Sequence, residues 1–427
     1  MFAKTFAKKL ESFGIHYGWV IAFLAFLTTV FSSATLSIPQ LMILPLTETF
    51  NWKISDVTLS IAVMYIVLAS IAPFGGALML RLGLPKVVII SISFTIVGLT
   101  TMIFSSETWH LLFNIGLCLG VASGILGLGL NATVATRWFV AKRGLVVGIL
   151  TGGFAAGQLI FLPFMAWIVS NFNWQMAIVP CLVGSTLCGI FFLLFGRSWP
   201  HELDIAPFGE TKLYFPPALD KKGTIHISIS ALVGAVRHPS FWMLAITFFI
   251  CGLTSTGIVG QHFIPFCADN NVGIIAASSY LAVMGVFNFI GTMSSGWLSD
   301  RYDNYNLLFL YYGLRGVSLI FLPYSDFDIF ALTLWAMFFG LDYIATVPPT
   351  VKLTGRAFGV VGGPVVFGWI FSAHQFGSAL AAYGAGLSRD SLLSYLPAFI
   401  VAGLFCFFAS ILILFFKFSK AVWTKPA

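Results

Sequence analysis

Two ionised side chains lie in surroundings where such groups are rare. Arg315 and Asp342 are the only Lys, Arg, Asp or Glu residues well inside the long apolar stretches of this sequence. The others fall in the breaks between the stretches or at their ends. An ionised group in a bilayer interior costs about 2.5–3.5 kcal/mol on insertion scales, so each of the two needs a partner or a function.

Arg315 and Asp342 are expected to pair with each other. They lie on consecutive apolar runs joined by a short break, at depths of about 14 Å and about 12 Å from the same side. Matching depths favour a buried ion pair. Two hypotheses remain open: the pair holds the two helices together, or Asp342 binds a coupling proton and Arg315 tunes its affinity for that proton.

Polar side chains deep in the apolar runs are candidates for substrate binding, because burying a polar group without a partner is unfavourable. Gln158 and the neighbours His374 and Gln375 lie about halfway along their runs. A histidine, with an unperturbed pKa near 6.5, binds an anion while protonated and releases it when neutral. The alternative for His374 is a hydrogen-bonded packing residue. Further candidates for substrate binding are His262, Thr29 and Ser33.

Other chemistries find no support in the residue pattern. No nucleotide-binding loop, metal-ligand spacing or catalytic triad is recognisable, so we expect no enzyme, no cofactor and no metal site. The six cysteines include no C-x-x-C pair and are interpreted as free thiols. The net charge of +7 is attributed to membrane topology and anionic lipid contact, not to nucleic-acid binding.

Helices that cross a membrane must position these groups. Of the 427 residues, 59% are hydrophobic and 9% charged, whereas a soluble chain carries about a quarter charged residues. Apolar runs of roughly 20 residues fit membrane-spanning helices. The twelve expected spans are 18–46, 56–79, 86–104, 109–134, 144–169, 175–196, 241–266, 274–298, 306–323, 328–349, 358–386 and 396–416.

The basic residues predict the orientation of these spans. With the N-terminus in the cytoplasm, nineteen Lys and Arg residues fall inside and only Lys53 and Arg389 outside. This is the bias of the positive-inside rule. We therefore expect a multi-pass protein of the plasma (inner) membrane with both termini cytoplasmic.

The chain divides at its longest polar break. We predict an N-terminal six-helix bundle (residues 1–197), a cytoplasmic linker (198–240) and a C-terminal six-helix bundle (241–427). Residues 224–237 are expected to form a short interfacial helix.

The two halves are related as an internal repeat. Segment 76–81 matches 296–301 at an offset of 220, and 136–139 matches 355–358 at 219. Repeated halves around a midplane site are the architecture of alternating-access carriers. Two glycine pairs follow at 220: Gly148 with Gly368, and Gly157 with Gly377.

These motifs carry a family resemblance. Gly296-Trp-Leu-Ser-Asp300-Arg301 resembles the G-x-L-a-D-R-x-G-R/K loop of the major facilitator superfamily, with Asp303 in place of the second Gly. Segment 138–148 and Tyr17-Gly18-Trp19-Val20 resemble the monocarboxylate and oxalate/formate porter branch. The resemblance covers the full length and implies an all-α polytopic membrane protein, with twelve transmembrane helices in two pseudo-symmetric six-helix bundles.

In the resembled family the loop motifs hold a cytoplasmic gate shut in one state; the alternative is that their charges only signal topology. Gly296 is expected to let the end of its span approach a neighbouring helix closely. Leu80 stands where the first copy of the motif has Asp, so the lock in the N-terminal half is expected to be weakened or absent. The gate candidates are Asp300, Arg301, Arg81, Arg137 and Arg143.

The resemblance also bears on the substrate. Where the oxalate/formate group carries a Lys in a Ser-Ala-Lys context, this chain has Ser372-Ala-His374, and Thr292 stands where the group has Arg. One titratable His suits a monoanion or a neutral, proton-coupled substrate better than a dicarboxylate. Under the repeat offset, Gln158 and His374/Gln375 are expected to face each other across a cavity. Ninth spans are usually peripheral in this family, which favours a structural role for Arg315 and Asp342.

The leading functional hypothesis is a secondary carrier, a monomer that moves a small organic anion with proton coupling, as a symporter, or by exchange. Its expected partners are that substrate, protons and membrane lipids, with no nucleic acid. The alternatives are an exporter of a larger apolar compound or metal chelator, and a non-transporting membrane sensor with a carrier fold.

Overall fold

The computed structural model describes residues 2–127, 129–213 and 223–419. Within these ranges the chain is helical apart from short connections and one β-bridge between Phe139 and Phe208. Four of the basic residues assigned to the cytoplasmic side lie outside the described ranges: Lys221, Lys222, Lys420 and Lys425.

Twelve helical segments of the described chain are long and apolar enough to cross a membrane, as predicted. Six of them precede the central linker. The elements up to the linker are α1 (Phe2–Glu11), α2 (Gly18–Phe50), α3 (Ile54–Leu82), α4 (Leu84–Ile103), α5 (Thr108–Leu111), η1 (Leu112–Leu119), α6 (Gly120–Leu126), α7 (Gly129–Trp138), α8 (Arg143–Asn171) and α9 (Trp174–Phe195).

The linker carries two short helices and the second half carries the other six spans. A helix was expected over 224–237, and one is found over Thr224–Ala235. The elements are η2 (Pro200–Leu203), α10 (Thr224–Ala235), α11 (Pro239–Gly252), η3 (Leu253–Val259), α12 (Gly260–Asp269), α13 (Ile274–Arg301), α14 (Asn304–Phe321), η4 (Leu322–Tyr324), α15 (Ile329–Tyr343), α16 (Val347–Leu392) and α17 (Leu396–Phe418).

Several spans depart from a straight α-helix. The fourth and seventh spans contain the π-helical stretches η1 and η3, and such stretches are frequent at functional sites. The tenth span, predicted over 328–349, runs from Ile329 to Gly359 and is interrupted at residues 344–346. Gly359, with a φ of 76°, ends this span and divides α16 between the tenth and eleventh spans.

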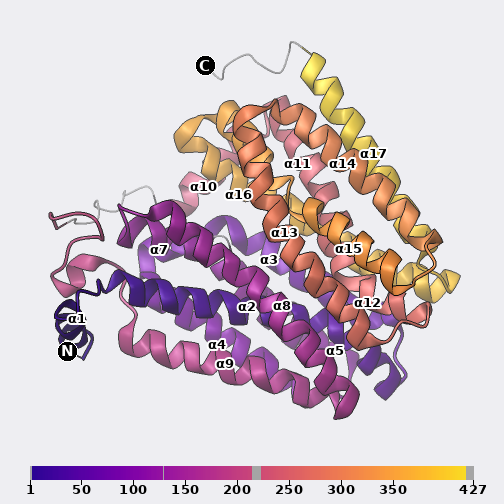
Figure 1. Cartoon of the computed structure of the whole chain (residues 1–427), viewed down its shortest axis with the longest axis horizontal. Coiled ribbons are helices and arrows are strands. Elements are labelled where there is room, and N and C mark those ends of the chain that lie inside the picture. The colour runs from indigo at the N-terminus through magenta and orange to yellow at the C-terminus, as the bar shows by residue number, and fades with distance from the viewer. Residues whose placement is uncertain (1, 128, 214–222, 420–427) are drawn as a thin grey trace.

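The two halves lie side by side and meet along two helix pairs, α3 with α16 and α8 with α13 (Figure 1). Close packing within the N-terminal half uses the small residues that the sequence repeats at intervals of four. A β-carbon at Gly116, Gly120 or Gly124 would come within 2.9 Å of atoms of α3. The stripe therefore lets the fourth span approach the second.

We call the end of the bundle that carries residues 139–142 and 196–213 the linker end, and the opposite end the distal end. Near the distal end the halves are joined: both carboxylate oxygens of Asp390 accept backbone N–H groups, those of Ile54 and Ser55, at 3.2 and 2.7 Å. At the linker end a β-carbon at Gly144 or Gly296 would have no neighbouring heavy atom within 4 Å among the described residues. The close approach predicted for Gly296 is therefore wrong for this conformation.

Candidate functional site

The buried charges lie at the break in the tenth span. Arg315 on α14 has no exposed surface, and its Nε donates to Asp342 Oδ2 at 2.6 Å, which is the ion pair expected from the sequence. Its Nη2 donates to the backbone carbonyls of Asp342 and Tyr343 at 2.7 and 3.2 Å. The last carbonyls of a helix have no partner within it. Arg315 therefore caps the C-terminus of α15 as well as pairing with Asp342.

Residues on neighbouring helices contact the other polar groups at the break in the tenth span. Arg315 Nη1 donates to Cys251 Sγ on α11 at 3.1 Å, and that sulfur lies 3.2 Å from Thr346 Oγ1. Pro349 has no N–H to offer the carbonyl of Ala345, four residues earlier. The hydroxyl of Ser295 on α13 donates to that carbonyl instead. The interruption is thus tied to α11, α13 and α14.

His374 lies beside this cluster. Its ring is 4.9 Å from that of Phe248 on α11, between ring centroids, and stacks on Phe371 at 5.9 Å. Cys251 interacts electrostatically with both Arg315 and His374. The structure therefore gathers into one region of the C-terminal half two groups that the sequence analysis treated separately.

Some polar atoms in this half have no partner among the described residues. His374 is 8% exposed, Gln375 6% and Asp342 7%. Buried polar groups are nearly always hydrogen-bonded, so such atoms are candidates for a ligand or a proton. The unpartnered atoms include His374 Nδ1, Gln375 Oε1, Asp342 Oδ1 and, on α12, Gln261 Oε1.

Polar contacts also cross between the halves near mid-depth. Gln261 Nε2 donates to the hydroxyl of Tyr65 on α3 at 2.8 Å, and both residues are buried. Ser372 Oγ on α16 donates to the carbonyl of Ala69 at 2.7 Å. Pro73 lacks the N–H that would otherwise reach this carbonyl, so the other half supplies its partner.

Two predicted substrate residues, Thr29 and Ser33, have partners within their own half. Thr29 Oγ1 donates to Ala25 O and to Asn131 Oδ1 at 2.9 and 3.0 Å. Ser33 Oγ donates to Phe154 O on α8 at 2.7 Å. These contacts give both residues a place in helix packing.

His262 also lies within the packing of its own half. Its Nε2 is 2.7 Å from Ala382 O and its Nδ1 is 3.4 Å from the Tyr395 hydroxyl. The side chain has no exposed surface. The structure therefore favours a packing role for His262 over the predicted substrate contact.

Gln158 and His374, which were expected to face each other across a cavity, lie on helices with different packing partners. Gln158 is half-buried on α8, which packs against α2 and α13, whereas α16 packs against α3 and α11. His374 faces α11 and the interior of its own half. Gln375, three residues after Ser372, lies on the side of α16 that Ser372 presents to α3.

The gate candidates are found at the linker end. Asp300 pairs with Lys352 on α16. The guanidinium of Arg301 lies over the ring of Trp297 on its own helix, at 4.1 Å from the centroid. Arg81 is exposed. Arg143 Nε donates to Phe139 O at 2.9 Å.

Arg137 is the buried member of the gate candidates. It is 6% exposed, and its Nη2 donates to Met79 O at 3.2 Å. Its guanidinium lies 4.3 Å from the centroid of the Trp199 ring.

The motif residues at the start of α2 pack against the end of α7 and the residue that follows it. The Tyr17 ring lies 6.0 Å from that of Trp138, and the Trp19 ring 5.1 Å from that of Phe139. The Tyr17 hydroxyl donates to Phe195 O at 2.7 Å, and burial raises the pKa of Tyr17 to about 12. This cluster lies at the linker end of the N-terminal half.

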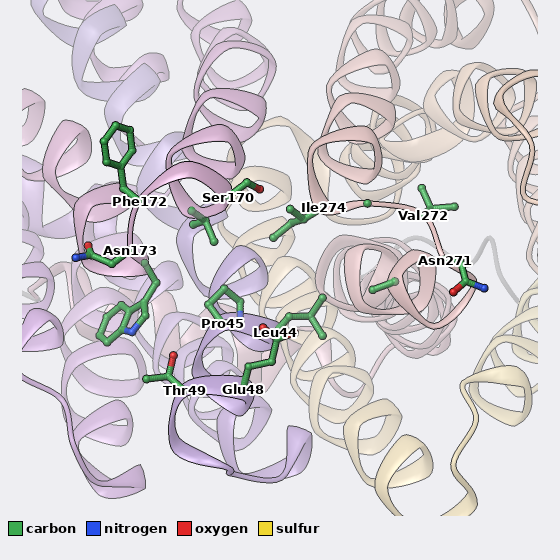
Figure 2. Close-up of a pocket in the computed structure, with 14 residues that line it drawn as sticks. Leu44, Pro45, Glu48, Thr49, Ser170, Phe172, Asn173, Asn271, Val272 and Ile274 are labelled. Atoms are coloured by element: carbon green, nitrogen blue, oxygen red, sulfur yellow. The ribbon is translucent and has the colours of Figure 1, made fainter.

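A cavity of about 620 Å³ opens at the distal end between the halves (Figure 2). Its walls come from the end of α2, the α8–α9 turn and the α12–α13 turn, with Glu48 as its one charged residue among those described. None of the predicted substrate residues lines it. The region around His374 is therefore separate from this cavity.

Sequence reasoning missed four residues of the site: Cys251, Thr346, Tyr65 and Lys352. The first three contribute through partners on other helices, which a single sequence does not reveal. The break that presents Thr346 had a signal, since Pro348 and Pro349 start a new helix rather than continue one. Lys352 also had a signal in the sequence. It is a charged residue that follows the break in the tenth span, at the depth expected for Asp300.

Comparisons with known proteins agree with this architecture. The family model described as Major Facilitator Superfamily matches residues 21–382. An uncharacterized MFS-type transporter, YcxA of Bacillus subtilis (strain 168), is 25% identical over 399 residues, covering 88% of this chain and 90% of the relative. Monocarboxylate transporter 13 of Rattus norvegicus is 24% identical over 397 residues, covering 91% and 86%.

A solved structure shares the fold. The bacterial homolog of the human lysosomal transporter Spinster, in an inward-facing and unoccupied conformation, aligns with a TM-score of 0.70. The alignment covers 96% of this chain and 99% of that chain at 16% sequence identity.

Proposed function

The chain belongs to the Major Facilitator Superfamily, and we propose that it is a secondary carrier that moves a small organic anion, such as a monocarboxylate, with proton coupling or by exchange. The proposal includes alternating access in a plasma (inner) membrane, with the linker end on the cytoplasmic side. The bias of basic residues toward that end supports this orientation.

The observation that carries the proposal is the buried imidazole of His374, with its Nδ1 unpartnered among the described residues. An imidazolium buried alone is unfavourable, and so is a buried carboxylate alone. Together they form a neutral pair. A site of this kind binds an anion and a proton more favourably together than either by itself, and this linkage is the basis of coupling.

Gln375 is the proposed second substrate contact. It lies on the side of α16 that faces α3, and its Oε1 is unpartnered within the described part of the chain. The relatives named monocarboxylate transporters support a carboxylate as the charged group.

The proposed role of Arg315 and Asp342 is structural. Three donor contacts of the Arg315 guanidinium end on Asp342 and the α15 terminus, and a fourth ends on Cys251. Such a fully engaged guanidinium suits a helix cap better than a site that exchanges ligands.

The proposed gate is at the linker end. The absence of neighbours around Gly144 and Gly296 among the described residues supports an inward-open state. Closing this end would bring the helix ends with Asp300, Arg301 and Arg143 toward the opposite half.

Uptake into proteoliposomes tests the function. Purified protein is supplied with a panel of labelled carboxylates, with and without an inward proton gradient. We expect uptake of a monocarboxylate that rises with the gradient. His374→Ala should abolish anion binding, while Gln158→Ala, on α8, should retain it.

Unchanged affinity in the His374→Ala protein would reject the site. No flux for any carboxylate, together with thermal stabilisation by a bulky apolar ligand, would reject the function and support an exporter or a sensor instead.

A further inference from the structure

The internal repeat equates three positions at the linker end, and two of them differ in charge. The offsets of 220 and 219 align Leu80 with Asp300, and Thr133 with Lys352. In the C-terminal half these positions form the Asp300–Lys352 ion pair. In the N-terminal half both are uncharged. Arg137 is the counterpart of Arg356, so the arginine is present in both halves. The N-terminal half has Leu80 at the position where the other half has the carboxylate of Asp300.

A cavity lies where the N-terminal half lacks this carboxylate. It has a volume of about 720 Å³ and lies between the linker ends of α3 and α7 and the segment 199–213. Its walls include Leu80, Thr133, Thr136, Arg137, Arg143 and Lys212.

Arg137 is the central group of this cavity. The side chain is only 6% exposed, and its Nη2 donates to Met79 O. Its Nη1 has no hydrogen-bond partner within the described ranges. A buried guanidinium N–H without an acceptor is unfavourable, so a ligand that supplied this acceptor would stabilise the site.

The other charges of the cavity favour an anion. Arg143 and Lys212 line it as cations and are exposed to solvent, and Glu210 is the acidic residue among its described walls. Glu202 interacts electrostatically with Arg137, and its Oε1 accepts the backbone N–H groups of Ser198 and Trp199. The cavity walls therefore carry three cationic side chains and one carboxylate. Glu202 offsets part of the charge of Arg137.

We propose that this cavity binds a small oxyanion, a phosphate or phosphate monoester, with Arg137 Nη1 as its principal donor. The bound oxyanion occupies the place that the Asp300 carboxylate holds in the other half. Arg143, Lys212 and the hydroxyls of Thr133 and Thr136 complete the set of donors. Bridging α3, α7 and the linker, the anion stabilises this end of the N-terminal half.

The cavity volume is larger than inorganic phosphate requires. The same donors suit a phosphate that carries an organic group, either a soluble ester or the headgroup of an anionic lipid. Both sources present the same chemistry to Arg137, and the experiment distinguishes them.

Thermal unfolding of the purified full chain tests the proposal. Protein in neutral detergent is titrated with sodium phosphate and with glycerol 3-phosphate, against sodium chloride at equal ionic strength. A second series uses lipid nanodiscs with and without phosphatidylglycerol. Saturable stabilisation by the soluble phosphates identifies a soluble ligand, and stabilisation by phosphatidylglycerol alone identifies a lipid headgroup.

The variant Leu80→Asp supplies the missing carboxylate. Leu80 is 50% exposed, so the substitution is tolerated sterically. We expect it to remove the stabilisation by either source, because the new carboxylate pairs with Arg137 and repels the anion. The matched control is Leu82→Asp, on the same helix end but outside the cavity walls, which should keep the stabilisation.

Arg137→Gln should also remove the effect; if this variant does not fold, Leu80→Asp still decides. The proposal is wrong if neither phosphates nor phosphatidylglycerol raise the unfolding temperature above the chloride control. It is equally wrong if Leu80→Asp responds as the unsubstituted protein does. Neither outcome depends on which substrate is transported.

Discussion

The two halves of this molecule share a helical framework but use their buried polar groups differently. In the N-terminal half, Thr29, Ser33 and Ser91 each donate to a partner in the same half. In the C-terminal half, Arg315 and Asp342 bring charge into the core, and Asp342, His374 and Gln375 keep unpartnered atoms within the described chain. Within the described chain, the buried ion pair of the membrane core therefore lies in the C-terminal half, beside atoms of His374 and Gln375 that have no partner.

At the linker end the difference is reversed. There the C-terminal half has the Asp300–Lys352 pair, whereas the N-terminal half has Leu80, Thr133 and the incompletely partnered Arg137. Duplication preserves the packing because both copies must bury similar faces. The charged positions are less constrained by packing, and they differ between the halves. The following predictions test that separation.

The largest effect is expected at the buried ion pair. Asp342→Asn leaves the Arg315 charge without its partner in a fully buried site, which costs about 3–5 kcal/mol. We expect a strong loss of folded protein, measured as the monodisperse fraction in fluorescence-detected size-exclusion chromatography. Asp300→Asn, which breaks an exposed pair, should leave the yield of folded protein nearly unchanged.

Normal yield of Asp342→Asn with lost proton dependence of uptake would overturn the structural role and make Asp342 the coupling site. A second variant separates pairing from capping. Arg315→Met with Asp342→Leu removes both charges but leaves the α15 carbonyls without their donor. Full recovery of stability would show that the cap contributes little.

The next prediction tests whether the two halves pack equivalently even though their buried charges differ. Gly157 and Gly377 are equivalent in the repeat, and a β-carbon would meet Val30 O at 2.4 Å and Phe249 O at 2.0 Å, respectively. Substituting either by Ala forces a helix pair apart, at a cost of about 1–3 kcal/mol. Thermal unfolding in nanodiscs should show losses of similar size for the two.

The matched control for this pair is Gly384→Ala on α16, where a β-carbon would have no heavy atom within 4 Å among the described residues. This variant should be stabilised by up to about 1 kcal/mol, through helix propensity. A loss at one of Gly157 and Gly377 alone would show that the packing of the halves has diverged as well.

The features that could be predicted from the sequence are those that a lipid environment requires of any membrane-spanning chain. Twelve spans follow from the need to satisfy backbone groups in an apolar solvent, and the partner of Arg315 follows from the rarity of charge there. Contacts between distant helices were not predictable from residue type. Thr29, Ser33 and His262 resemble substrate contacts until their partners on neighbouring helices are known.

The break in the tenth span shows where local signals were available but incomplete. Pro348 and Pro349 mark a helix start, yet only the structure shows that Ser295 and Arg315 satisfy the freed carbonyls. The expectation that Gln158 and His374 face each other across a cavity rested on the repeat alone. A repeat offset relates equivalent positions but does not state which helices meet across the two halves.

A smaller effect is expected at two serines that donate to carbonyls freed by proline. Ser372 reaches Ala69 in the other half, and Ser295 reaches Ala345 within its own half. Substitution by Ala leaves a buried acceptor unsatisfied, at about 1–3 kcal/mol. We expect Ser295→Ala near the upper figure and Ser372→Ala near the lower, because Ala345 O lies within one half, whereas the proposed alternating access separates the halves at Ala69 O and lets water reach it.

A second substitution checks the assigned cause of the Ser372→Ala loss. Pro73→Ala restores an N–H four residues after Ala69, so the double variant should recover most of the stability in a thermal double-mutant cycle. If the double variant instead loses as much stability as the two single variants together, the role given to Pro73 is wrong.

The smallest effect concerns how each half ties its terminal helix at the linker end. In the N-terminal half, Lys4 donates to Asp204 at 2.9 Å, and this hydrogen bond and charge lower the pKa of Asp204. In the C-terminal half, Lys417 lies 3.5 Å from Asp303 and also donates to the uncharged Asn306 Oδ1 at 2.6 Å. The first tie needs an ionised carboxylate, and the second has a partner that does not titrate.

A depressed folded-state pKa means that the tie of α1 is complete above the ordinary aspartate pKa of about 3.9 and is lost as pH falls through the lowered value. Hydrogen exchange, corrected for its intrinsic pH dependence, should show protection of α1 falling in that acidic range. Asp204→Asn should remove the step and lower protection already at pH 7. Protection at the end of α17 should change less, because Asn306 keeps its bond to Lys417. An equal acid-induced loss at both helices would show that the two ties respond to a shared opening of the linker end, and not to the titration of Asp204.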